Sequence, residues 1–179
     1  MPTIFTHGFA AFTLGKTFFE KVSTTKLLIA AVICAMLPDA DVIGFAFHIP
    51  YESMFGHRGF THSICFAILL ALIVKEIFFR EVKLNSKTGR LIFLLLFLST
   101  VSHPLLDMLT NGGRGVALFA PFSNHRYFCP WFRPIQVSPI GAGNFFSKWG
   151  VEVLISEFKW IVLPCIVILL GAKFFKKAK

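Results

Sequence analysis

Acidic side chains are scarce in this sequence. Its 179 residues include nine aspartates and glutamates against eighteen lysines and arginines, and charged residues make up only 15% of the total. Hydrophobic residues make up 55%, phenylalanine alone contributes 23 residues, and the mean hydropathy is +0.71. An ordinary soluble domain carries more charge and less apolar surface. The composition therefore argues against a soluble protein with a very large core and indicates a polytopic membrane protein.

Several other motifs are missing. None of the four cysteines has a partner at Cys-x-x-Cys spacing, so neither a disulfide framework nor a cysteine-ligated metal is expected. Ser123 lacks a Gly-x-Ser-x-Gly motif, which argues against a serine nucleophile. The net charge of +9 is spread over short loops and the C-terminal tail, so no nucleic-acid partner is expected. The first residues lack the positive region of a secretory signal peptide, and we expect them to be retained.

Long apolar runs predict the fold class. Residues 59–79 and 91–109 are near the length that a helix needs to cross a bilayer, and residues 158–175 form a third run. The shorter runs 4–19 and 27–37 predict a helical hairpin that turns at residues 20–25. We therefore expect an all-α polytopic membrane helical bundle of about five helices, in one domain over residues 1–179. Glycine and proline crowd residues 110–153, which predicts an irregular outer loop segment.

Basic residues between the apolar runs predict the orientation. They cluster at residues 16–26, 80–90 and 173–179. Cytoplasmic loops are enriched in lysine and arginine, so five helices place all three clusters and the C-terminus in the cytoplasm. The N-terminus and the segments 38–58 and 110–153 then face outward, although these segments carry some basic residues of their own.

Aspartate occurs at only three positions, each beside an apolar run. Ionisable groups in such places are costly and usually carry function or are paired. Carboxylate and imidazole are ligands for Zn²⁺ and similar divalent ions. The candidate ligands are Asp39 and Asp41 in LPDAD, His57 and His62 in GHRGFTH, His103 and Asp107 in SHPLLD, and His7 near the N-terminus. His103 and Asp107 are spaced i, i+4 and share a helix face; a polar pair bridging two helices is the alternative.

The expected depths of these residues agree. Asp39 and His103 each lie 13 residues after the last basic residue before their apolar run, and His7 lies 12 residues before the expected end of the first helix. At a rise of about 1.5 Å per residue, all three lie roughly 18–20 Å above the cytoplasmic boundary. His62 lies roughly 26 Å above it by the same rise. The hydrocarbon core is about 30 Å thick, so we expect four helices to bring these side chains together in the outer half of the membrane.

Catalytic candidates flank the expected ligands. Pro38 predicts a helix end that leaves Asp39 and Asp41 on irregular backbone, which at membrane depth is buried in protein or lines a wet cavity. Either carboxylate is a candidate ligand or general base; a surface turn is the alternative. Arg58 and Arg126 are candidates for binding a phosphate and offsetting its charge. For Arg58, a rim charge paired with lipid headgroups is an equal alternative.

The sequence around each of the other histidines predicts where it lies. His57 and His62 are five residues apart and do not share a helix face, so we expect His57 in a loop and His62 in the first helical turn. His125 is interpreted as a solvated loop histidine, and His48 as an interfacial residue.

Five blocks in this order resemble a known family: THGFAAFTLG, LPDADVI, GHRGFTHS, SHPLLDMLTNGG and FAPFSNHRYF, over roughly residues 5–130. The chain resembles the YdjM-like, LexA-regulated inner-membrane metal-dependent hydrolases of bacteria, which are grouped with zinc-dependent phospholipase C and S1/P1-type nucleases. The resemblance implies a multi-pass protein of the bacterial inner membrane and a metal-dependent hydrolase of phosphoesters. By analogy the ligands would be His7, Asp39, His57 or His62, His103 and Asp107.

Three functions follow as hypotheses. The first is a membrane-embedded hydrolase of phosphoesters in lipid or lipid-linked substrates, acting from the outer, periplasmic side with a metal-activated water. Zn²⁺ is the expected ion, with Mn²⁺ or Mg²⁺ as alternatives. The second is a metal transporter or a non-catalytic metal-binding membrane protein, although the chain lacks the internal repeats typical of transporters. The third is a scaffold whose polar residues only hold helices together.

Overall fold

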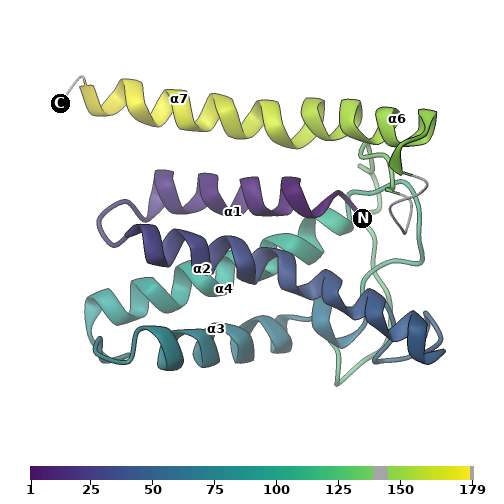
Figure 1. Ribbon diagram of the computed structural model, residues 1–179, viewed down its shortest axis with the longest axis horizontal. Coiled ribbons are helices and arrows are strands. Elements are labelled where there is room, and N and C mark those ends of the chain that lie inside the picture. Colours follow the sequence, from purple (N-terminus) through teal and green to yellow (C-terminus); the bar gives the residue numbers. More distant parts are fainter. Residues whose placement is uncertain (139–144, 178–179) are drawn as a thin grey trace.

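The computed structural model describes residues 1–138 and 145–177 and confirms the all-α membrane architecture. Within these residues there is no β-strand, only two isolated bridges, Thr110 with Ile135 and Val116 with Tyr127. The helices α1 (Ile4–Phe18) and α2 (Thr25–Met36) form the predicted antiparallel hairpin (Figure 1). Thr24 begins α2 because its side chain accepts a hydrogen bond from the Leu27 amide.

The α-helical geometry of α2 ends at Met36, but the backbone does not become irregular at Pro38, contrary to the sequence prediction. It tightens into a 3₁₀ helix, η1 (Leu37–Phe47), which continues α2 and contains both Asp39 and Asp41. Proline is tolerated in the first turn of a helix, where its missing N–H has no partner to lose. The apolar stretch Thr25–Phe47 is therefore one helix long enough to cross a membrane.

A second hairpin packs against the first. It consists of α3 (Ile64–Phe78) and α4 (Lys87–Asp107), preceded by a short 3₁₀ turn, η2 (Phe60–His62). The apolar run 59–79 is only partly helical, because α3 begins after the Ser63 cap and has 15 residues. By length and hydropathy α4 is a candidate span and α3 is not. Buried residues of α2, α3 and α4 form the apolar core, among them Ala31, Ala71 and Leu95.

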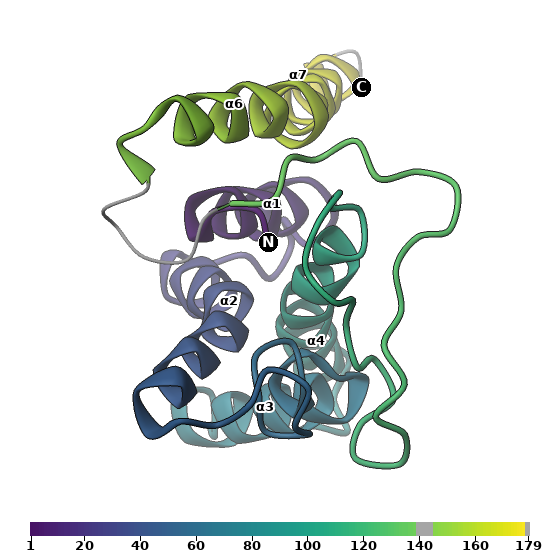
Figure 2. The same cartoon turned by 90° about the vertical axis from the view of Figure 1, so that its right-hand side faces the viewer.

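The last segment of the chain that the structure describes is one long helix. It comprises α6 (Lys148–Glu157), a π-helical turn η3 (Phe158–Val162) and α7 (Leu163–Lys177), and it supplies the third candidate span, Lys148–Lys176. Figure 2 shows this helix lying against α1, on the far side from α3. It begins at Lys148, so the irregular segment is shorter than the predicted 110–153. Residues 139–144 of that segment, and residues 178–179, lie outside the described residues.

Both hairpin turns and the C-terminal end of α7 lie at one end of the bundle, while η1, η2 and the loops after α4 lie at the other (Figure 1). The three basic clusters of the sequence therefore share one end. The motifs with the candidate ligands gather at the opposite end.

Candidate metal centre

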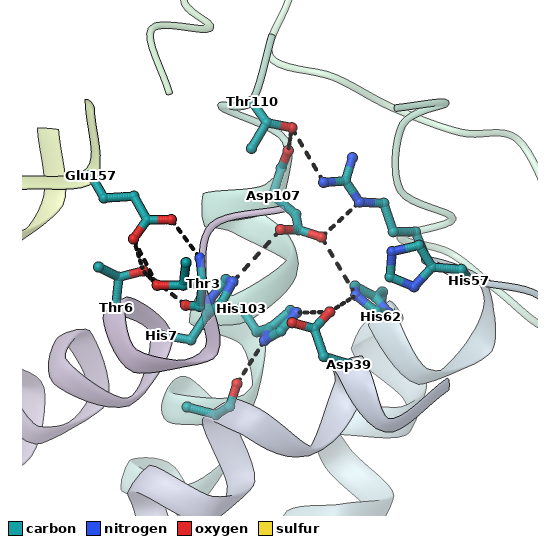
Figure 3. Close-up of polar contacts among 12 residues, drawn as sticks. Thr3, Thr6, His7, Asp39, His57, His62, His103, Asp107, Thr110 and Glu157 are labelled. Atoms are coloured by element: carbon teal, nitrogen blue, oxygen red, sulfur yellow. Dashed lines mark hydrogen bonds and ion pairs between the residues drawn. The ribbon is translucent and has the colours of Figure 1, made fainter. Parts of the chain in front are cut away.

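Four buried side chains converge where η1, η2 and α4 meet. Each of Asp39, His62, His103 and Asp107 offers a ligand atom, and these atoms all lie within 4.8 Å of one another. His103 Nε2 lies 3.2 Å from Asp39 Oδ1, and His62 Nε2 lies 3.5 Å from both Asp39 Oδ1 and Asp107 Oδ2 (Figure 3). Two atoms bound about 2.1 Å from one tetrahedral ion lie about 3.4 Å apart. The observed spacing fits ligands of a single ion.

His7 of α1 joins this group. Its Nε2 lies 3.7 Å from Asp107 Oδ1, and its ring stacks on His103 with the centroids 3.7 Å apart. His7 is fully buried. Four helical segments far apart in sequence therefore supply five candidate ligands: His7 from α1, Asp39 from η1, His62 from η2, and His103 and Asp107 from α4.

Most donor atoms facing the centre have no hydrogen-bond partner. They are Nε2 of His7, His62 and His103, both carboxylate oxygens of Asp39 and Oδ1 of Asp107, whereas Asp107 Oδ2 pairs with Arg58. Buried polar atoms are nearly always paired, because an unpaired buried group loses its hydration without compensation. A divalent cation bound among them satisfies all of these atoms and offsets both negative charges. The residues therefore fit a metal ion, and their mixed imidazole and carboxylate donors are of the kind that Zn²⁺ accepts.

Hydrogen bonds on the far sides of two rings orient them toward the centre. His103 Nδ1 lies 2.7 Å from the Ala35 carbonyl oxygen, which can only accept, so Nδ1 carries the proton. His62 Nδ1 lies 3.1 Å from both Asp41 Oδ2 and the Thr61 hydroxyl oxygen; because that hydroxyl donates its own proton to Asp41, Nδ1 is the donor here too. With the proton on Nδ1, the nitrogen that can bind a cation is Nε2, which faces the centre in both rings. Such partners are usual for metal-binding histidines.

Asp41 lies beside the centre, with its oxygens already paired. Its Oδ1 lies 2.6 Å from His57 Nδ1, and its Oδ2 accepts from the Arg58 amide at 3.0 Å and the Thr61 hydroxyl at 2.7 Å. Asp41, His57 and His62 also form a second group with metal-compatible spacing, which shares His62 with the first. Both Asp41 oxygens already have hydrogen-bond partners. We therefore interpret Asp41 and His57 as residues that position His62 and the loop before η2.

The Arg58 side chain points into the metal centre and does not lie at the rim, where it could pair with lipid headgroups. Its Nε lies 2.9 Å from Asp107 Oδ2, and Nη2 donates to the Thr110 hydroxyl at 3.3 Å. The side chain is only 1% exposed. Gly113, at φ 88°, leaves the room that this requires, since a Cβ there would lie 2.7 Å from Arg58 Nη1.

Arg126 connects loops at the outer edge of the centre. It donates to the backbone carbonyls of His57 at 2.9 Å and Tyr51 at 2.8 Å. Burial lowers the pKa of its guanidinium from the ordinary value, although arginine stays charged at neutral pH. His125 and His48 lie away from the ligands: His125 packs edge-on against Tyr127, and His48 caps the end of η1.

Glu157 was not among the sequence candidates. Its carboxylate accepts hydrogen bonds from the Thr3 amide at 2.5 Å, the Thr3 hydroxyl at 2.7 Å and the Thr6 hydroxyl at 3.1 Å (Figure 3). It thereby caps the first turn of α1, next to His7, with a side chain from α6. The available signal was an acidic residue directly before the apolar run 158–175.

Comparisons with known proteins agree with this architecture. A family model described as YdjM inner membrane protein matches residues 1–179. The chain is 41% identical over 167 residues to "Inner membrane protein YbcI" of Escherichia coli (strain K12), covering 92% of each chain. No solved structure matches the chain significantly.

Proposed function

The chain belongs to the YdjM inner membrane protein family, and we propose that it is a membrane-embedded, metal-dependent hydrolase of phosphoesters in lipid or lipid-linked substrates. The observation that carries the proposal is the convergence of the buried side chains of Asp39, His62, His103 and Asp107, with His7 beside them, most of whose facing nitrogen and oxygen atoms have no hydrogen-bond partner.

These five side chains would hold the ion, with Zn²⁺ as the expected metal and Mn²⁺ or Mg²⁺ as alternatives. A bound divalent ion supplies Lewis acidity toward a phosphoryl oxygen and lowers the pKa of water. Asp39 has two unpaired carboxylate oxygens, so one can bind the ion while the other accepts a proton. Asp41 holds His62 in the tautomer that presents Nε2.

The two arginines offset negative charge near the centre. Arg58 pairs with Asp107 at the centre itself, and Arg126 holds the loop that carries His57. Positive charge fixed in a buried site stabilises the charge that develops on a phosphoryl group. In this role Arg58 acts directly on the site, and Arg126 acts through the loop.

We place the centre on the periplasmic side of the inner membrane. The basic clusters lie at the end of the bundle opposite the ligands, and positive charge favours the cytoplasm. The C-terminal end of α7 shares the basic end, so the proposal puts the C-terminus in the cytoplasm.

A non-catalytic metal-binding protein is the second candidate. It is supported by the burial of every ligand, since closed sites with no open position are typical of structural metals. A transporter fits less well, because transporters bind their ions near the midplane between repeats, whereas these ligands gather at one end of the bundle.

The test is to purify the protein in detergent, measure bound metal by elemental mass spectrometry, and assay a panel of phospholipids and soluble phosphoesters. His103→Ala and Asp107→Ala should lose both metal and turnover. His125→Ala is the control, because His125 is an exposed histidine away from the centre. Wild type without stoichiometric metal would reject both candidates. Metal without turnover on the whole panel would reject the hydrolase and leave the non-catalytic role.

A further inference from the structure

A groove of about 310 Å³ lies between the start of α1 and the junction of α2 with η1. Its walls are apolar, formed by Ile4, Ile33, Met36, Leu37 and Ala40, and Asp39 is its one acidic residue. A group the size of a water molecule occupies roughly 30 Å³. The groove therefore has room for about ten such groups. It can therefore hold a segment of hydrocarbon chain.

The groove is in a part of the molecule that faces lipid. Ile33 is 53% exposed and Leu37 is 39% exposed, and both belong to the candidate span Thr25–Phe47. Exposed apolar side chains on a spanning helix contact the hydrocarbon of the bilayer. A lipid chain can therefore enter this groove sideways without crossing water.

Asp39 connects the groove to the metal centre. The residue lines the groove, yet its carboxylate oxygens are buried, with Oδ1 lying 3.2 Å from His103 Nε2 and 3.5 Å from His62 Nε2. The same residue thus borders the apolar groove on one side and the candidate ligands on the other.

The wall between the two is the 3₁₀ helix η1, which runs for 11 residues. Stretches of 3₁₀ helix longer than three or four residues are uncommon, because their hydrogen bonds have poorer geometry, and within a helix they often mark a hinge. Of the elements that border the centre, η1 is the longest stretch of 3₁₀ helix, so it is the one we expect to act as a hinge.

Other cavities fit this role less well. The groove between α1 and α6 contains Thr3, Thr6 and Glu157, whose polar groups already bind one another. The groove between α2 and α3 lies near Lys26 and Phe78, at the basic end of the bundle. A cavity of about 60 Å³ beside Arg58 and His57 has room for about two water molecules and none for a chain.

We propose that the groove beside Asp39 receives a hydrocarbon chain of a phospholipid whose phosphate binds the metal centre, so that the substrate enters from the bilayer past η1. This inference rests on the proposed function, since it names the substrate class and entry route of the same site. The hydrocarbon chain of the lipid then determines which phosphoesters reach the ion, so the groove sets the substrate specificity.

The test uses two photoreactive lipids in dodecyl maltoside micelles, which contain no phosphate. One is a phosphonate analogue of phosphatidic acid, which resists hydrolysis, and the other is a diacylglycerol with the same diazirine-bearing chains. Zinc-loaded protein is illuminated with each probe below saturation, and labels are mapped by peptide mass spectrometry. The measured quantity is the label on residues 33–40 relative to the label on the exposed face of α3 around Ile73 and Ile77.

We expect this ratio to be about tenfold higher with the phosphonate, which corresponds to 1.4 kcal/mol of headgroup binding. His103→Ala should remove the difference. Ala40→Trp, which fills the groove from an exposed position, should remove it while metal stoichiometry stays at the wild-type value. Ile33→Trp replaces it if that variant does not fold, and Leu170→Trp on α7, where the leucine is 62% exposed, is the matched control outside both measured regions.

Equal ratios for the two probes would overturn the proposal, as would a phosphonate excess that survives both groove-filling variants. The failures are distinguishable. Headgroup-dependent labelling of the groove without turnover of any phosphoester keeps the groove and rejects the hydrolase. Phospholipid turnover with equal labelling ratios keeps the hydrolase and rejects the groove.

Discussion

The guanidinium Nε of Arg58 lies 2.9 Å from Oδ2 of Asp107, and both side chains are fully enclosed by protein. Arg58 reaches this position from a left-handed backbone conformation at φ 60°, which is costly for a residue with a side chain and persists where surrounding contacts require it. The ion pair brings a positive charge from the loop before η2 to the carboxylate at the end of α4. It offsets part of the negative charge that Asp39 and Asp107 bring together.

Replacing Arg58 by glutamine should destabilise the metal-free protein strongly. Removing one partner of a buried pair leaves an uncompensated charge and costs about 3–5 kcal/mol. Added Zn²⁺ should restore part of the loss, because the cation also compensates Asp107. Thermal unfolding in detergent with EDTA and with Zn²⁺ measures both effects. Arg80→Gln is the control, since the Arg80 pair is about 80% exposed, and an equal loss in both variants would contradict the role of Arg58.

Asp39 and Asp41 should respond differently to alanine substitution. Asp39 faces the centre with unpaired oxygens, so Asp39→Ala should lose stoichiometric metal. Asp41 orients His62 from behind, and loss of such a partner weakens metal binding by about 10–100-fold. Asp41→Ala should therefore still fill at saturating Zn²⁺. Competition with a chromophoric chelator measures both affinities; complete loss of binding in Asp41→Ala would identify Asp41 as a ligand.

Glu157→Ala should lower both stability and metal affinity. The variant leaves the Thr3 amide without its acceptor in a buried setting, at a cost of about 1–3 kcal/mol, whereas the Thr6 hydroxyl keeps its hydrogen bond to the Thr3 carbonyl. It also releases the first turn of α1, which positions His7. Glu152→Ala is the matched control on the same helix, because Glu152 is exposed. Unchanged Zn²⁺ affinity in Glu157→Ala would show that the cap does not position His7.

Reporter fusions test the orientation. A green fluorescent protein joined to the C-terminus should fluoresce, and an alkaline phosphatase joined there should be inactive, because both report a cytoplasmic location. The physical reason is the cluster of lysines at residues 173–179. An active phosphatase at the C-terminus would reverse the placement of the metal centre.

Local patterns in the sequence predicted the order of the helices, although α3 is shorter than the apolar run 59–79 suggested. The caps at Thr24, Ser63 and Ser86 begin helices because each hydroxyl group accepts a hydrogen bond from a backbone amide of the first turn. The sequence prediction was wrong after Pro38, where irregular backbone was expected and a 3₁₀ continuation is found. Proline removes a donor and restricts φ, but contacts elsewhere in the chain decide whether the helix then stops.

Composition, hydropathy and the positions of three aspartates and four histidines were enough to predict a membrane helical bundle with the candidate ligands in the outer half of the membrane. These properties follow from helical rise and from the cost of polar groups in hydrocarbon, which each segment carries by itself. Only the tertiary structure decided which atoms meet: Asp41 turns to His57 while Asp39 turns to His103, Arg58 pairs with Asp107, and Glu157 caps α1. The direction in which each of these side chains points depends on packing between helices far apart in the chain, which no local sequence pattern encodes.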